Sequence, residues 1–180
     1  PHETALTLNT RCYEAAMDSF GELLADLRGP GLRRVAQDLS QRTYHERLKR
    51  PAAAARLDFA QSADALVALV CALDHGAYWN PLTCAKVEVA GRVLAVGAAR
   101  AETDRAAAPA GAVLEATPAG LVVGTASVPV RLTGLRDLLG QPVCPSTVAT
   151  GGIVLPPLDA ATARQLTEAH AAVVAGEARW

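Results

Sequence analysis

Apolar residues recur at spacings of three and four along residues 4–28, and this pattern predicts one long amphipathic helix. Gly29-Pro30-Gly31 predicts where that helix ends, because glycine and proline both interrupt helical structure. A helix with a single apolar stripe requires a surface to cover it. We therefore expect this stripe to pack on the rest of the chain or on another chain, or to stay partly exposed. The stripe consists of Leu8, Cys12, Ala15, Ala16, Phe20, Leu23, Leu24 and Leu27.

Two further helices are predicted, one over about 63–74 and one over about 159–175. Each begins at a residue suited to the N-cap, Ser62 in the first case and Asp159 in the second. Their apolar residues should face inward, since they too recur at helical spacing. These residues are Leu66, Leu69, Val70 and Leu73 in the first helix, and Leu158, Ala163, Leu166, Ala169 and Val173 in the second.

From Cys84 onward the apolar period changes to two, which is typical of strands. The predicted strands cover residues 86–89, 93–96, 111–116, 120–125 and 128–132, and Ala90-Gly91-Arg92 predicts a tight hairpin turn between the first two. Five short strands with tight turns are typical of a small closed barrel of the OB type. The expected fold is α+β: a five-stranded OB-like β-barrel flanked by an N-terminal amphipathic helix, an extended linker, one packing helix and a C-terminal helix.

The segment between the first two helices is basic, although the whole chain has a net charge of −1. Residues 28–56 contain eight basic residues and two acidic ones. Arg50-Pro51 disfavours helix here, and Leu57-Asp58-Phe59 offers apolar anchors for the strand domain. We expect four parts: a helix in 1–31, a linker in 32–61, the strand domain in 62–150 and a bridge helix in 151–180.

Residues 42–82 contain a series of short motifs. Thr43-Tyr44 is followed by Arg47-Leu48, then by Leu57-Asp58-Phe59, a helix, Ala72-Leu73-Asp74 and Asn80-Pro81. In this order they resemble the segment that joins the two halves of the methionyl-tRNA formyltransferase family. The resemblance implies that 3–24 is the last helix of a catalytic half, 32–60 the linker and 62–133 the C-terminal OB-like half. Cys71, where the family usually has arginine, and His75-Gly76-Ala77-Tyr78, in place of Pro-Gly, depart from the family pattern.

Residues 38–44, 47–54 and 72–82 look more like formyltransferase-like domains within nonribosomal peptide synthetases than like the tRNA enzyme. Residues 155–159 and the helix that ends near Trp180 resemble a bridge into a following synthetase domain. This variant implies neighbouring synthetase domains or a carrier protein as partners. It suggests a non-catalytic module with a structural, linker or docking role.

The catalytic residues of the family are an Asn, a His in a His-x-Ser-x-Leu-Pro run and an Asp, all in the N-terminal half. This chain contains no such run, so we expect no catalytic, cofactor-binding or metal-binding residue in it. One alternative is the acceptor-side half of an active N-formyltransferase, which uses 10-formyltetrahydrofolate on a carrier-bound aminoacyl group. The cofactor would then belong to an upstream catalytic half. A third alternative is a tRNA-binding OB module.

The candidate contacts to a partner or acceptor come from the linker and from the crossing after the second helix. They are Arg42, Tyr44, Arg47, Lys49, Arg50, His75, Tyr78 and Trp79. We interpret Asp74-His75 as a structural turn rather than an acid–base pair, because no nucleophile lies at a known spacing. Residues 85–133 contain five basic and four acidic residues and no Phe, Tyr or Trp, which disfavours a nucleic-acid platform.

No segment has the roughly 18 apolar residues of a membrane span, and we expect a cytoplasmic protein without a membrane partner. A homodimer formed through the stripe on 4–28 is a further expectation. The four cysteines form no Cys-x-x-Cys pair, so we expect reduced, buried thiols rather than disulfides or a metal site.

Overall fold

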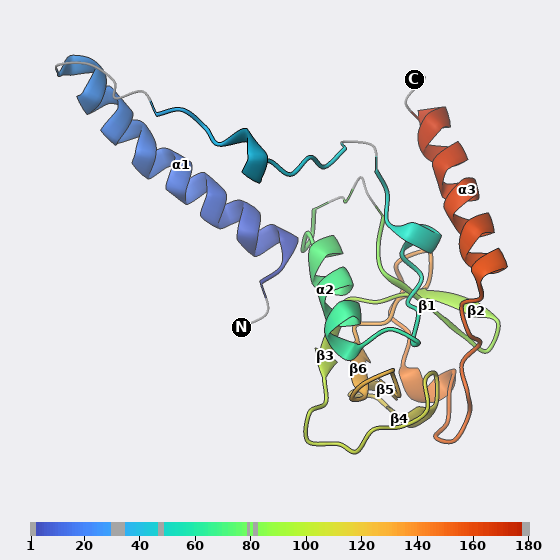
Figure 1. The fold of residues 1–180 in the computed structure, drawn as a ribbon. Coiled ribbons are helices and arrows are strands. Elements are labelled where there is room, and N and C mark those ends of the chain that lie inside the picture. Colours follow the sequence, from blue (N-terminus) through green and yellow to red (C-terminus); the bar gives the residue numbers. More distant parts are fainter. Residues whose placement is uncertain (1–2, 30–34, 47–48, 79, 81–82, 178–180) are drawn as a thin grey trace.

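The computed structural model describes residues 3–29, 35–46, 49–78, 80 and 83–177. Figure 1 shows a small body of strands with α2 packed on it, and two helices, α1 and α3, that project from the body. The described helices are α1 (Ala5–Arg28), α2 (Ala63–Leu73) and α3 (Ala160–Glu177). All three predicted helices are therefore confirmed. None of the described helices combines the length and the apolar character that crossing a membrane requires.

The described strands form two antiparallel sheets, and both consist of short strands. The first sheet pairs β1 (Lys86–Val89) with β2 (Arg92–Ala95) through the predicted hairpin. The second sheet has the order β3-β6-β5-β4. Its strands are β3 (Ala98–Ala101), β4 (Val113–Thr117), β5 (Gly120–Val123) and β6 (Val130–Thr133).

The α+β class is confirmed, but the expected closed barrel of five strands is wrong for the described residues, which form six strands in two sheets. The missed strand is β3, which is rich in alanine and shows no alternation of apolar and polar residues. Alanine has low strand propensity, so the segment gave no local signal. It becomes a strand because it pairs along its whole length with β6.

The two sheets meet at a corner, where the chain passes from β2 into β3. Ala95 exchanges two backbone hydrogen bonds with Arg136, at 2.8 and 3.0 Å. The Gly97 N–H donates to the Thr133 carbonyl at 3.1 Å. A side chain at Gly97 would place its Cβ 3.0 Å from the Gly134 carbonyl oxygen, which is tighter than ordinary packing. The corner therefore depends on two glycines that let two backbones approach closely.

The core lies between α2 and the sheets. Every residue of β5 is buried, and α2 packs its apolar face against β3 and β6. Ser62 begins α2 as predicted, since its hydroxyl accepts a hydrogen bond from the Ala65 N–H at 3.2 Å. The predicted linker anchors are confirmed, because Leu57 and Phe59 are both buried in the same core.

The apolar stripe of α1 is exposed, whereas the apolar face of α2 is buried. No residue of α1 is buried, and the helix contacts the body near its first turn, where the Leu6 N–H donates to the Asp74 carbonyl at 3.0 Å. Figure 1 shows the rest of α1 extending away from the sheets. Its large apolar side chains are exposed: Leu8, Tyr13, Met17, Phe20, Leu23, Leu24 and Leu27.

The four cysteines are free thiols, but the expectation that they are buried is wrong. Cys12 is exposed because α1 has no covering surface, and Cys84 is exposed just before β1. Cys71 and Cys144 are half-buried. Burial, followed by the charge of Asp74, raises the pKa of the Cys71 thiol, which keeps it protonated.

An ion cluster covers one face of the second sheet. Arg131 bridges two carboxylates, with Nε 3.1 Å from Glu102 Oε1 and Nη1 3.0 Å from Glu115 Oε1. Arg105 contacts both carboxylates and Arg100 contacts Glu102. The hydrogen bonds from Arg131 lower the pKa of Glu102 from its usual 4.5 to about 2, although partial burial opposes this shift.

Because of the ion cluster, the free energy of unfolding should depend on pH. A carboxylate whose pKa is lowered by folding stabilises the protein fully above pH 4.5, and this contribution is lost as the pH falls toward about 2. We expect Glu102→Gln to be less stable than wild type at pH 7 and to lose less stability on acidification. Urea unfolding between neutral and acidic pH measures this. Glu14→Gln on exposed α1 is the control, and equal pH slopes for wild type and Glu102→Gln would contradict the prediction.

The corner should not tolerate a side chain. We expect Gly97→Ala to destabilise the protein by about 1–3 kcal/mol, because its Cβ would press on the Gly134 backbone. Gly21→Ala is the matched control, since a Cβ there meets nothing within 4 Å on the exposed α1 helix. It should leave stability unchanged or raise it by up to about 1 kcal/mol. Thermal unfolding of both variants is the measurement, and a neutral Gly97→Ala would contradict the account of the corner.

Candidate functional site

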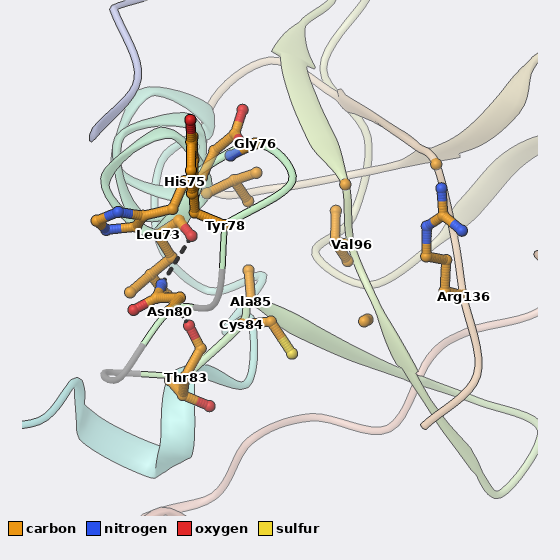
Figure 2. A pocket seen from close by; sticks show the side chains of 15 residues that line it. Leu73, His75, Gly76, Tyr78, Asn80, Thr83, Cys84, Ala85, Val96 and Arg136 are labelled. Atoms are coloured by element: carbon orange, nitrogen blue, oxygen red, sulfur yellow. Dashed lines mark hydrogen bonds between the residues drawn. The ribbon is translucent and has the colours of Figure 1, made fainter. Parts of the chain in front are cut away.

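The candidate site is a pocket of about 470 Å³ between the end of α2 and the corner of the two sheets. Its floor is apolar and is formed by Val70, Leu73, Ala85 and Val96. Figure 2 shows His75 and Tyr78 on one side of the pocket and Arg136 on the opposite side. The pocket therefore combines an apolar floor with polar groups from the crossing after α2 and from the segment after β6.

Asp74 and His75 follow α2 directly, and the geometry favours the structural-turn interpretation. One carboxylate oxygen of Asp74, Oδ1, accepts a hydrogen bond from the Gly76 N–H at 2.8 Å. The Asp74 carbonyl accepts the Leu6 N–H from α1. This Asx turn reverses the chain after the helix. Among the described residues, no three His, Cys, Asp or Glu side chains are grouped so that they could hold a metal ion.

Asn80 holds the chain that crosses from α2 to β1. Its side-chain amide donates to the Leu73 carbonyl at 2.8 Å and to the Thr83 carbonyl at 2.7 Å, as the dashed lines in Figure 2 show. The first acceptor lies in the last turn of α2, where carbonyl groups lack helical partners. Asn80 therefore closes the helix end and fixes that side of the pocket.

The linker enters the body through an unusual turn of alanines, Ala52–Ala55. Three consecutive residues, Ala53–Ala55, have positive φ angles of 49, 52 and 61°, a conformation that costs non-glycine residues energy. The Lys86 ammonium holds this turn by donating to the Ala54 carbonyl at 2.8 Å. It also donates to Thr83 Oγ1 at 2.6 Å and to the Cys84 carbonyl at 3.0 Å. Burial lowers the pKa of Lys86, and its three acceptors compensate for the lost water.

The structure separates the candidate contact residues into two groups. His75 and Tyr78 line the pocket, with Tyr78 74% exposed. The linker residues do not line it: Arg42, Tyr44 and Lys49 are exposed and Arg50 is half-buried. The Arg42 guanidinium lies 5.8 Å from the centre of the Tyr44 ring. Arg47 and Trp79 lie outside the described residues.

Sequence reasoning missed Arg136 as a site residue. It comes from the irregular segment after β6, where no motif or period marks it. Its backbone pairing with Ala95 brings it to the pocket, and such pairing between distant residues leaves no local signal in the sequence.

Basic side chains on the strand domain are largely neutralised or buried by their own neighbours. Arg100, Arg105 and Arg131 form ion pairs with acidic residues of the sheet, and Lys86 is held by the alanine turn. These are four of the five basic residues in 85–133. A nucleic-acid surface requires cations that can reach phosphates. These four cations are therefore engaged within the protein.

No protein-family model matches the chain. Among curated proteins, the chain is similar to a methionyl-tRNA formyltransferase of Hydrogenovibrio crunogenus, with 32% identity over 167 residues. The aligned region covers 93% of this chain and 47% of the relative, so the chain spans about half the length of the curated relative that it matches. This weak homology over most of the chain supports the formyltransferase family indicated by the linker motifs.

The contact between Lys86 and the alanine turn should hold the linker on the body. We expect Lys86→Met to lose about 1–3 kcal/mol of stability, because it leaves the Ala54 and Cys84 carbonyls and the Thr83 hydroxyl without their donor. Amide exchange should rise at Ala53–Leu57 more than in β5. Lys49→Met, which changes an exposed lysine of the same linker, is the matched control. Unchanged exchange in the turn would refute this role.

Proposed function

Because the chain is related to a methionyl-tRNA formyltransferase over most of its length, we propose that it is a non-catalytic, acceptor-side module of a formyltransferase-type protein. In this proposal it works by docking and spacing neighbouring domains. The observation that carries the proposal is the exposed apolar face of α1, which is built as a stable arm but covered by nothing among the described residues.

The arm is held firmly at its start. Thr4 and Thr7 form a reciprocal capping box, with the Thr7 hydroxyl accepting the Thr4 N–H at 2.8 Å. The Leu6 side chain packs against Gly76, where a Cβ would lie only 2.6 Å from Leu6 Cδ2. The beginning of α1 is thereby fixed beside the pocket. A partner surface that covers the far end would be held at a defined distance from it.

Burial of the apolar face of α1 against a partner would contribute substantial free energy of binding. A fully buried Leu, Phe or Met side chain contributes about 1.5–3 kcal/mol, and Phe20, Leu24 and Leu27 are respectively 55, 38 and 58% exposed. We propose a neighbouring domain of the same protein as the occupant. The alternative occupant is a second copy of the chain, which would make a homodimer through α1.

The C-terminal helix is attached to the linker rather than to the sheets. The Ala53 N–H donates to Thr167 Oγ1 at 2.8 Å, and the Arg56 guanidinium donates to the Pro156 carbonyl at 3.4 Å. Arg56 is itself held by Glu88 of β1 at 2.9 Å. The path from the linker to α3 is therefore continuous and supports a spacing role, in which α1 and α3 leave one body in fixed directions (Figure 1).

The finer proposal places this module within a nonribosomal peptide synthetase. It rests on the resemblance of residues 38–44, 47–54 and 72–82 and on the C-terminal helix. The proposed OB-type domain then occupies 62–150, between a linker at 32–61 and a bridge helix at 151–180. Neighbouring synthetase domains or an acidic carrier protein are the proposed partners. The exposed linker cations Arg42 and Lys49 suit an acidic surface.

The nearest alternative is the acceptor-side half of an active N-formyltransferase. The curated relative favours it, since that protein is itself named as a formyltransferase. In that case the chemistry lies in a part of the protein that this chain does not contain. The tRNA-binding alternative is weaker, because the arginines of the sheet are engaged by Glu102 and Glu115.

A formyl-transfer assay separates these proposals. The chain is incubated with 10-formyltetrahydrofolate and an aminoacyl-loaded carrier domain, and the same assay is run on a longer polypeptide that joins it to the catalytic half that the acceptor-side alternative requires. We expect no formyl-aminoacyl product from the chain alone, because it contains no His-x-Ser-x-Leu-Pro run of the kind that carries the catalytic His of the formyltransferase family. Product from the chain alone would contradict the proposal. Product from the longer polypeptide alone would establish the acceptor-side alternative.

A further inference from the structure

The pocket beside α2 carries opposite charges at its two ends, and the docking role of α1 does not use them. Arg136 and Asp74 both line the pocket, and Figure 2 shows Arg136 across the pocket from His75, the residue that follows Asp74. Between them lies the apolar floor that includes Val70 and Val96. An apolar floor with a few placed polar groups is typical of small-molecule sites.

Arg136 is oriented but not neutralised. Its Nη1 donates to the Gly140 carbonyl at 3.1 Å, which holds one edge of the exposed guanidinium. The neighbouring carboxylate, Asp137, accepts the Leu139 and Gln141 N–H groups, each at 2.9 Å, and so stabilises the loop instead. Within the described part of the chain, no acidic side chain forms an ion pair with Arg136. A guanidinium that is held on one edge and has further N–H groups to donate suits an oxyanion.

Asp74 is the complementary group at the opposite end. Its position is set twice, by the Gly76 N–H on Oδ1 at 2.8 Å and by the Leu6 N–H on its carbonyl. Across the described residues, no cation pairs with its carboxylate. The remaining oxygen can accept a hydrogen bond from an ammonium group.

We propose that this pocket binds a small aliphatic zwitterion, with its oxyanion on Arg136, its ammonium group on Asp74 and its carbon chain on the apolar floor. The pocket volume of about 470 Å³ falls within the usual range for small-molecule sites. One cation and one anion in the pocket match the two ends of such a ligand. A ligand with a single charge would leave one of these groups unpaired, so both ends contribute to selection.

The probes are ω-amino acids from glycine to aminohexanoate, titrated into the whole chain while amide chemical shifts are followed. We expect saturable shifts at Asp74–Gly76 and at Ala95–Gly97, with one chain length binding most tightly. The alkyl carboxylate and the alkylamine of that length should each bind at least about tenfold more weakly, since each lacks one charged hydrogen bond. Absence of saturable binding by every probe, or equal binding of all three compounds, would overturn the proposal.

Two variants assign the ends of the ligand. Arg136→Gln should weaken binding of the zwitterion about tenfold and leave binding of the alkylamine unchanged. Asp74→Asn keeps a side-chain oxygen that accepts the Gly76 N–H, so the turn should be retained. This variant should weaken binding of the zwitterion but not binding of the alkyl carboxylate. Arg92→Gln, on the β1–β2 hairpin outside the pocket, is the matched control and should bind normally. Equal loss in Arg92→Gln, or none in Arg136→Gln, would refute the site. This test is independent of formyl transfer.

Discussion

The close approach of Gly97 and Gly134 is the constraint on which the rest of the body depends. One extended segment leaves the first sheet at Ala95 and enters the second sheet at Ala98, and the glycines allow the two backbones to meet there. The same corner brings the β6 end next to α2. The pocket, the position of Arg136 and the burial of the core strands all follow from this one crossing.

The molecule divides its charges and apolar surface in a consistent way. In the body, carboxylates and arginines neutralise each other on the sheet, and Lys86 satisfies the strained alanine turn. On α1 and on the linker, apolar and basic groups remain exposed, as with Phe20 and Arg42. A sheet whose charges pair with one another, together with apolar side chains exposed on α1, suits the proposed docking role, because the binding energy would then come from α1.

Much of the fold could be predicted from the sequence where the signal is local. Helical spacing located α1, α2 and α3, and the Ala90-Gly91 turn located the first hairpin. Positions defined by distant partners could not be predicted. The alanines of β3 become a strand only through β6, and the closed five-stranded barrel was wrong for that reason. At the site, His75 and Tyr78 were found from the crossing motif, whereas Arg136 depends on pairing with a residue about forty positions away.

The most direct test of the docking proposal is oxidative side-chain footprinting of α1 in this chain and in a longer protein that contains the proposed neighbouring domain. Tyr13, Met17 and Phe20 are 68, 75 and 55% exposed and react readily when uncovered. We predict strong labelling in the dilute chain and protection in the longer protein, with Leu139, which is 86% exposed, as the reference. Protection that rises with concentration of the chain alone would identify a second copy as the occupant. Equal labelling of the three residues in both proteins would contradict the claim that α1 is a docking arm.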